Sequence, residues 1–401
     1  MSNVKEYFGN IRRGFRVKNF INYFAVIFLT VLTASLSAAG ALQRSTLILL
    51  EQISYSVILA VSLSLVVGFL GELSLGHAAF MSLGAFIGGY LQTYVFKDLL
   101  SASPLLSVVV AMLVGGLVAA VFGCIIGLPA LRLKGDYLAI VTLAFGEIVK
   151  TVFVNMKTFD GAVGLRTYRY DVHKLFIIGF VAVFFTLVVV QNLIRSKHGR
   201  AITAIRDNEI AARAMGVNVT FYKLAVFVLS AFFAGVAGVL FSNANNSFRA
   251  ATFDYNYSIN ILVMVVLGGM GSINGSIIAA ALITFINNKL ATVLTGDLAS
   301  LQNLFYALIL IALVIYNNAP KLKGFREKYN FRNLFAFLWK KIRRLFTKKS
   351  EKAPDPSVER ADKGDWSNIP TKIEMDAILS TDLTPDRTYT PDKPDKPKGG
   401  N

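Results

Sequence analysis

The sequence predicts an all-α, polytopic membrane protein, and three observations lead to this fold class. Of its 401 residues, 54% are hydrophobic and only 16% are charged, with a mean hydropathy of +0.55, whereas soluble domains usually carry about 25% charged residues. The apolar residues form long runs, many of them close to the ~20 residues that cross a bilayer as a helix. Lys and Arg gather between these runs, as the positive-inside rule describes.

Ten apolar runs are candidate spans, because a helix satisfies its own backbone hydrogen bonds inside lipid. They lie near residues 21–42, 47–70, 76–96, 105–129, 136–156, 175–194, 221–241, 257–272, 273–292 and 300–317. We therefore expect about ten transmembrane helices in one membrane domain over residues 21–318.

The first run, Ile21 to Leu42, follows a basic N-terminal segment, residues 1–20, and ends in small residues. This pattern also occurs in signal peptides, whose apolar region is usually ~7–15 residues long. Because the run is longer than that, we interpret it as a retained first helix in the cell membrane.

Alternation from a cytosolic N-terminus places four basic segments on the cytosolic side, including the loop over residues 195–220 and the run after residue 320. Both termini are then cytosolic. Residues 157–174 and 242–256 face the outside, where a delivery protein could reach them. The formal net charge of +17 does not indicate nucleic-acid binding, because the cations flank membrane spans and form no basic face on a soluble fold.

The character of the chain changes past residue 318. Residues 319–349 carry apolar and basic side chains at helical spacing, which predicts a basic amphipathic helix on the cytosolic leaflet. Residues 350–401 are rich in Pro, Asp, Lys and Ser and too poor in apolar residues to build a core, which predicts a disordered tail.

Two glycine-rich segments interrupt the predicted spans. Irregular backbone at membrane depth is tolerated where it is buried in protein or lines a wet cavity, and paired glycine-interrupted segments point to a translocation pathway. Close packing of helices explains a single glycine equally well. The candidate pathway residues are Gly71, Glu72, Ser74, Gly76 and His77 in the first segment, and Gly268, Gly269 and Gly271 in the second.

Glu72 has two interpretations at this stage. Its carboxylate could hold the ammonium group of a solute, or it could be a hydrated group at the cytosolic interface, because an ionisable side chain at membrane depth needs a partner or a wet cavity.

Motifs for catalysis or nucleotide binding are absent from the sequence. It contains no G-x-x-x-x-G-K-[ST] phosphate loop, no H-E-x-x-H zinc motif and no G-x-S-x-G nucleophile elbow, and its three histidines are widely separated. We expect no catalytic residue, no metal site and no cofactor bound by this chain.

The predicted cytosolic loop contains an amphipathic stretch from Gly199 to Gly216. If it is wound as one helix, Ile202, Ile205, Ile210, Ala214 and Met215 share an apolar face, while residues 206–209 point outward. A short rigid helix of this kind can dock into a groove on a soluble partner, or it can simply link two spans. The pattern alone leaves both interpretations open.

Four motifs carry a resemblance to a known family. The stretch Gly199 to Gly216 resembles the coupling loop of ABC importer permeases. Residues 71–80, 131–147 and 266–272 resemble the branched-chain amino-acid permease family, in particular its larger, M-type subunit, and the motifs follow the family's order over roughly residues 45–320. Glu72 departs from the family pattern, which more often has Gln there, and the family does not account for the tail after Ser350.

The resemblance implies an ABC importer permease fold with glycine-broken helices. It also implies partners: a second homologous permease subunit, two ATP-binding subunits that hydrolyse ATP, and an extracytoplasmic substrate-binding protein. The residues that would couple to the ATPases are Gly199, Arg206, Asn208, Glu209, Ala211, Ala212 and Gly216.

Leucine, isoleucine and valine are the solutes that the resemblance implies, while urea, short amides and nucleosides are alternatives. An ion-coupled secondary transporter is an alternative mechanism, although it usually places several ionisable groups within the spans, and such groups are sparse here. A scaffold without transport activity would not need glycine-interrupted spans.

Overall fold

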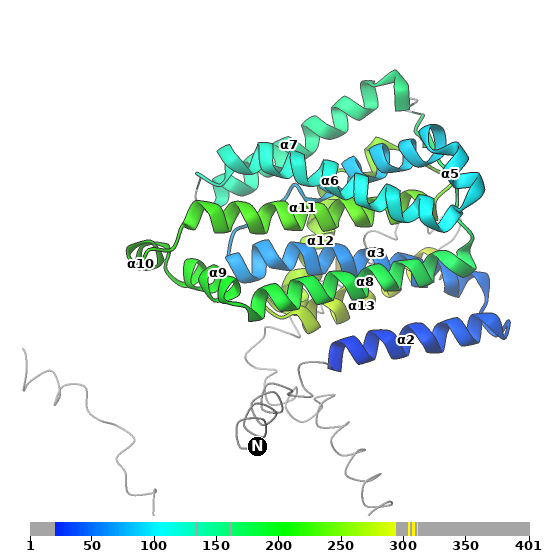
Figure 1. Cartoon of the computed structure of the whole chain (residues 1–401), viewed down its shortest axis with the longest axis horizontal. Coiled ribbons are helices and arrows are strands. Elements are labelled where there is room, and N and C mark those ends of the chain that lie inside the picture. The colour runs from blue at the N-terminus through cyan, green and yellow to red at the C-terminus, as the bar shows by residue number, and fades with distance from the viewer. Residues whose placement is uncertain are drawn as a thin grey trace, which may run out of the picture. The chain divides into compact units, whose positions relative to one another are not determined.

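A computed structural model describes residues 21–133, 135–159 and 163–293, together with Leu304, Ala307, Leu308 and Ile311. The described part is almost entirely helical (Figure 1), which confirms the all-α class. The predicted basic N-terminus, the amphipathic segment at 319–349 and the tail lie outside the described residues. The predicted span at 300–317 also lies outside them, apart from the four single residues named above.

Seven segments of the described chain are long and apolar enough to cross a bilayer. Six of them end within about three residues of predicted runs, and Ala250–Gly268 overlaps the predicted run at 257–272 but begins earlier. The seven segments are Arg44–Leu70 (α3, Arg44–Ser64, continued by η2, Leu65–Leu70), α6 (Pro104–Ala130), α7 (Asp136–Asn155), α8 (Val172–Arg195), α11 (Val219–Ala244), Ala250–Gly268 (η6, Ala250–Thr252, and α12, Tyr255–Gly268) and α13 (Ile273–Val293).

Two further predicted spans are helical but are not among these seven segments. The first is α2 (Ile21–Ala38), which packs on α8 through a small apolar cluster around Phe176 and Phe180. The second is helical backbone from His77 to Val95, in which π-helical turns alternate with α-helix. Its named parts are α4 (His77–Leu83), η3 (Gly84–Gly88) and η4 (Leu91–Val95).

The end of the bundle that carries residues 157–174 and 242–256 contains the only two strands of the described residues. β1 (Leu165–Arg166) and β2 (Ser247–Phe248) pair antiparallel, with Leu165 opposite Phe248. Below them the side-chain amides of Gln92 and Asn243 bond to each other in both directions, at 2.8 and 3.0 Å. The two predicted outer loops are therefore tied together. The short helices α5 (Lys97–Ala102) and η5 (Lys157–Phe159) also flank this region.

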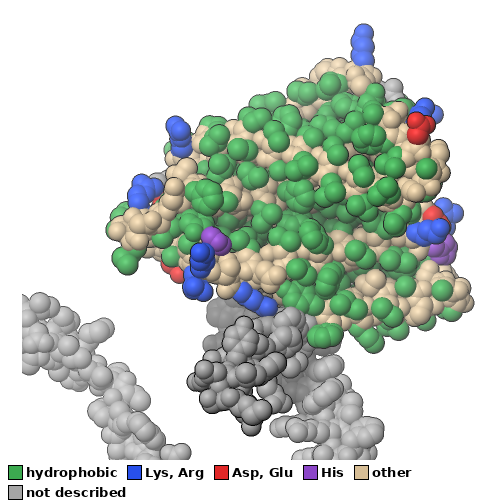
Figure 2. All heavy atoms as spheres, in the orientation of Figure 1, with side chains coloured by type: hydrophobic (Ala, Val, Ile, Leu, Met, Phe, Trp, Pro, Cys, Tyr) green, Lys and Arg blue, Asp and Glu red, His purple; other side chains and the backbone are tan. Residues whose placement is uncertain are grey.

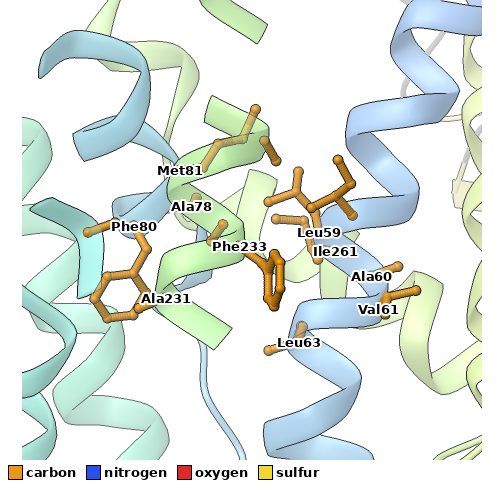
Figure 3. Close-up of a cluster of buried hydrophobic side chains, with 14 of the residues drawn as sticks. Leu59, Ala60, Val61, Leu63, Ala78, Phe80, Met81, Ala231, Phe233 and Ile261 are labelled. Carbon is orange, nitrogen blue, oxygen red and sulfur yellow. The ribbon is translucent and has the colours of Figure 1, made fainter. Parts of the chain in front are cut away.

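Helices α3 and α11 form the centre of the bundle. In the most apolar stretch of the α3–η2 segment 94% of the residues are buried, and in that of α11 72% are buried. Figure 3 shows Leu59 and Leu63 of α3 on one side of Phe233 of α11, with Phe80 of α4 on the other side. Most other spans bury less than half of their residues, so they form the outer layer.

Glycine lets the backbones of α11 and the α4–η3 segment come very close together. A Cβ atom added to Gly84 would overlap the backbone of Gly235, and one added to Gly238 would overlap the carbonyl of Met81. In a membrane such contacts between small residues replace the hydrophobic effect as the source of association between helices.

The side of the bundle is apolar and its ends are charged. In Figure 2 hydrophobic side chains cover the middle of the visible face, whereas most Lys, Arg, Asp and Glu side chains lie toward the two ends. Large apolar residues of the outer helices are open to the surroundings, among them Leu117 of α6 at 58% and Phe185 of α8 at 57% exposure. This distribution fits helices that face lipid.

The close glycine contacts generate a prediction for stability. Replacement of Gly235 by Ala places a methyl group 2.6 Å from the Cβ of Ala119 and 2.7 Å from the carbonyl of Gly115, so overpacking should cost roughly 1–3 kcal/mol. Thermal unfolding in detergent measures this as a lower melting temperature. The matched control is Gly146→Ala, whose new methyl group would meet its nearest neighbour at 4.0 Å. Equal melting temperatures for the two variants would contradict the packing.

Candidate functional site

Two short helices between α8 and α11 form a bent element that we call the elbow: α9 (Lys197–Asp207) and α10 (Glu209–Ala214). The hydroxyl of Ser196 accepts hydrogen bonds from the backbone N–H groups of His198 and Gly199 at the start of α9. Asn208 adopts an extended backbone, and its side chain accepts from the N–H of Ala211 at the start of α10. The prediction of a single helix from 199 to 216 is therefore wrong, because Asn208 acts as a new N-cap.

The break at Asn208 also separates the predicted apolar face. Ile202 and Ile205 of α9 are 2% and 4% exposed and pack into the core. Ile210 and Met215 are 79% and 84% exposed, since α10 starts in a new direction. The elbow is therefore anchored through α9 and presents two large apolar side chains at its tip, which Figure 1 places at one end of the bundle.

The other predicted elbow residues take structural positions. Ala212 is buried at 5% exposure, Ala211 supplies the capped N–H group, and Gly216 follows α10 with φ +83°. Gly199 packs directly on the backbone of Ile194. These residues shape the elbow and its junctions with α8 and α11.

Arg206 lies on the exposed side of α9, with its side chain 38% accessible, but its guanidinium group also reaches back to the bundle. Its Nη1 donates to the carbonyl oxygen of Gly68 at 3.1 Å, while Nε and Nη2 donate to Asp207 at 3.1 and 2.9 Å. Gly68 lies in the last turn of η2, where carbonyl groups lack a partner within the helix. The guanidinium group supplies that partner and links the elbow to the end of the α3–η2 segment.

A buried lysine makes a second link between the elbow and the bundle. Lys223 of α11 is 4% exposed, and its Nζ lies 2.5 Å from Oε1 of Glu72 and 3.1 Å from Oε2 of Glu209. Glu209 also binds Arg213 at 2.8 Å. Glu209 was predicted to face outward, and its attraction to Lys223 is the reason why it does not.

In this structure the contacts of Glu72 fit neither of its two interpretations. Its side chain is only 13% exposed, so it is not a hydrated interfacial group. Its Oε1 is bonded to Lys223, so in this conformation an ion pair within the chain takes the place that a solute ammonium group was suggested to occupy.

The two glycine segments meet beside Arg206. A Cβ on Gly68 would lie 2.6 Å from the backbone nitrogen of Gly271, and a Cβ on Gly71 would lie 2.6 Å from Cγ of Arg206. Gly71, Gly269 and Gly271 have φ values of +81°, +91° and +83°, a region that costs other residues about 1–2 kcal/mol. Gly268 packs on the backbone of Gly275 across the turn from α12 to α13. The turn is therefore held against the end of η2.

The chain between Gly71 and Gly76 is not helical and leads back into the bundle. Thr142 of α7 accepts from the N–H of Leu75 at 3.0 Å, and Ser258 of α12 accepts from the N–H of Ala78 at 3.1 Å. His77 bonds Ser62 of α3 at 2.8 Å. Side chains of α7 and α12 thus replace missing backbone hydrogen bonds, as irregular backbone inside a membrane requires, and the His77–Ser62 bond adds a side-chain contact with α3.

The predicted pathway residues fall into two groups along this segment. Gly71, Glu72, Gly269 and Gly271 lie at the elbow. Ser74 and His77 lie inside the bundle, each 2% exposed, and the hydroxyl of Ser74 has no hydrogen-bond partner. Gly76 packs on the carbonyl of Thr142.

Sequence reasoning missed Lys223, Thr142 and Ser258. A lone lysine near the start of an apolar run was a usable signal for Lys223, because a charge in a span calls for a partner. Thr142 and Ser258 carried no such signal, since hydroxyl residues are common in membrane helices. No group of three or more His, Cys, Asp or Glu side chains that could hold a metal occurs within the described residues.

Comparison with known proteins agrees with this architecture. Residues 45–314 match the model of the branched-chain amino acid transport system / permease component family, which is more than half of the chain. The chain belongs to this family. The match begins at α3 and includes both glycine segments and the elbow.

Curated proteins that are similar to the chain match two thirds or more of its length. The high-affinity branched-chain amino acid transport system permease protein LivM of Salmonella typhimurium is 33% identical over 303 residues, which are 67% of this chain and 68% of that protein. LivM of Escherichia coli gives the same identity and coverage. The ribose import permease protein RbsC of Escherichia coli is 27% identical over 73% of this chain and 92% of its own length. The search of solved structures gave no significant match.

The pairing of Lys223 generates a prediction for stability. Lys223→Met leaves the carboxylate of Glu72 without its cation, while Glu209 keeps only Arg213; the loss of one partner from a buried ion pair costs about 3–5 kcal/mol. We expect a clear fall of the melting temperature of the purified protein. Lys197→Met is the matched control, because Lys197 is exposed at the start of α9 and a change there should stay within about 0.5 kcal/mol. The pairing is contradicted if both variants melt like the wild type.

Proposed function

We propose that this chain is the membrane-spanning permease subunit of an ABC importer for branched-chain amino acids. Membership in the family supports the class of protein. The observation that carries the mechanism is the elbow, whose tip exposes Ile210 and Met215. Its inner side is bonded to the carbonyl of Gly68 and, through Lys223 of α11, to Glu72.

The importer would contain two ATP-binding subunits on the cytosolic side, and the elbow tip is the proposed contact with one of them. Exposed apolar side chains on a short rigid helix suit a groove on a soluble partner. ATP is bound and hydrolysed by those subunits, and this chain contributes the pathway. A second, homologous permease would complete the membrane part of the importer.

The proposed coupling runs from the elbow to the glycine segments. A push on α10 moves Glu209, and Lys223 and Glu72 transmit the displacement to the chain that follows η2. A push on α9 moves Arg206, which holds the carbonyl of Gly68. Packed elements of this kind shift as rigid bodies between discrete arrangements, so the turn from α12 to α13 should move with η2.

The opposite end of the bundle is the proposed contact for an extracytoplasmic substrate-binding protein. There β1 and β2 tie together the loops over residues 157–174 and 242–256. Both chain termini would be cytosolic in this orientation. Labelling of a cysteine placed at Met215 in sealed cells tests it: the label should react only after permeabilisation, and reaction from the cell exterior would overturn the orientation.

The direct test of the function is uptake into proteoliposomes that contain the complete importer. We expect uptake of leucine, isoleucine and valine only when the ATP-binding subunits and ATP are both present. Uptake by this chain alone, driven by an ion gradient, would instead establish a secondary transporter. ATP-dependent uptake of urea, an amide or a nucleoside, without that of an aliphatic amino acid, would overturn the solute assignment.

The elbow tip gives a prediction for assembly. Met215→Asp places a charge in the proposed apolar contact, and loss of an anchor residue at an interface costs about 2 kcal/mol or more. The apparent affinity for the ATP-binding subunits should fall about thirtyfold, measured by titration of the purified permease. Val163→Asp is the matched control, because Val163 is 73% exposed in the loop that carries β1. Equal affinities for both variants would contradict the elbow as the docking surface.

A further inference from the structure

A cavity of about 240 Å³ lies between α3, α12 and α13, away from the elbow. Among the cavity residues on α3, Gln52 is the farthest from the elbow. About 27 Å of helix separates it from Leu70 at the end of η2. Pockets for drug-sized ligands are usually ~300–1,000 Å³, so this cavity suits a smaller solute. Each helix contributes residues spaced by three or four positions, such as Gln52, Ser56 and Leu59 on α3, which together form one continuous wall.

The lining changes from polar to apolar along the cavity. Far from the elbow, the amide of Asn288 on α13 donates to Oε1 of Gln52 at 2.9 Å, and other amide and hydroxyl groups surround this pair. Nearer the elbow, the wall consists of Leu59, Ile261 and Met264. The described residues that line the cavity include no charged side chain.

Thr284 of α13 is an independent sign of a ligand. It lines the cavity, is 8% exposed, and its hydroxyl has no hydrogen-bond partner. Buried threonines in other spans bond the carbonyl of a preceding turn, as Thr142 does with Ala139 and Thr186 does with Ala182. A buried hydroxyl without a partner is costly, and a polar solute in the cavity would satisfy it.

We propose that this cavity holds the transported amino acid, with its ammonium and carboxylate groups at the Gln52, Thr284 and Asn288 end and its aliphatic side chain against Leu59, Ile261 and Met264. This inference rests on the proposed function and adds the place and orientation of the solute. A sugar carries hydroxyl groups on all sides and would leave some of them unpaired at the apolar end. Hydrogen bonds from neutral groups hold a zwitterion weakly enough for it to leave, as transport requires.

The test uses the complete importer in proteoliposomes, with valine and threonine as solutes delivered at saturating concentrations of loaded binding protein. These two amino acids have nearly the same shape and differ by one hydroxyl group. Thr284→Val removes the hydrogen bond to the solute backbone, so uptake of both amino acids should fall about fivefold. The matched control is Thr292→Val, an exposed position two turns along the same helix, and its uptake should equal that of the wild type.

A second variant tests the orientation of the solute. Met264→Gln makes the apolar end polar with little change in size, so the ratio of valine to threonine uptake should fall about tenfold. An unchanged ratio overturns the proposed orientation. A separate outcome concerns the site itself. If Thr284→Val and its control Thr292→Val both transport like the wild type, the cavity is not the solute site, whereas the proposed function still stands. An equal fall for both solutes in Met264→Gln leaves the ratio of valine to threonine uptake unchanged and therefore also overturns the orientation, and absence of uptake by the wild type overturns the proposed function as well.

Discussion

A buried cation between two carboxylates is the interaction that holds the elbow against the end of the helix bundle. Lys223 is nearly inaccessible and lies near the start of a membrane span, where an unpaired ammonium group would be very unfavourable. Glu72 and Glu209 neutralise it from opposite directions, one following the α3–η2 segment and the other at the start of α10. The need to pair this one charge fixes the position of the elbow against the bundle.

Glycine makes that arrangement sterically possible. Gly68, Gly71 and Gly271 lie so close to Arg206 and to one another that a side chain at Gly68 or Gly71 would overlap its neighbours. The same principle acts in the centre of the bundle, where Gly84, Gly235 and Gly238 bring α4, η3 and α11 into backbone contact. Close packing makes these regions stiff, and stiffness is what allows a displacement at the elbow to reach the turn between α12 and α13.

Much of the fold could be predicted from the sequence, because membrane spans are defined by local composition. The apolar runs at 105–129 and 175–194 correspond to α6 and α8 within a few residues. The elbow could be located because it is amphipathic, but its bend could not be predicted from periodicity. Asn208 fits a helical pattern on its outer face, and its capping role depends on backbone geometry. The contacts of Arg206 with Gly68 and of Glu209 with Lys223 depend on partners in other helices, and the pairing of Lys223 with Glu72 spans 151 positions of sequence.

Coupling requires that force applied at the elbow reaches the glycine segments through Arg206 and Lys223. The most direct test compares ATP hydrolysis and leucine uptake by the complete importer with Arg206→Met and with Arg200→Met, an exposed position of the same helix. We expect Arg206→Met to bind its ATP-binding subunits and hydrolyse ATP while uptake per ATP falls at least tenfold, and Arg200→Met to behave like the wild type. Unchanged uptake per ATP in Arg206→Met would contradict the account.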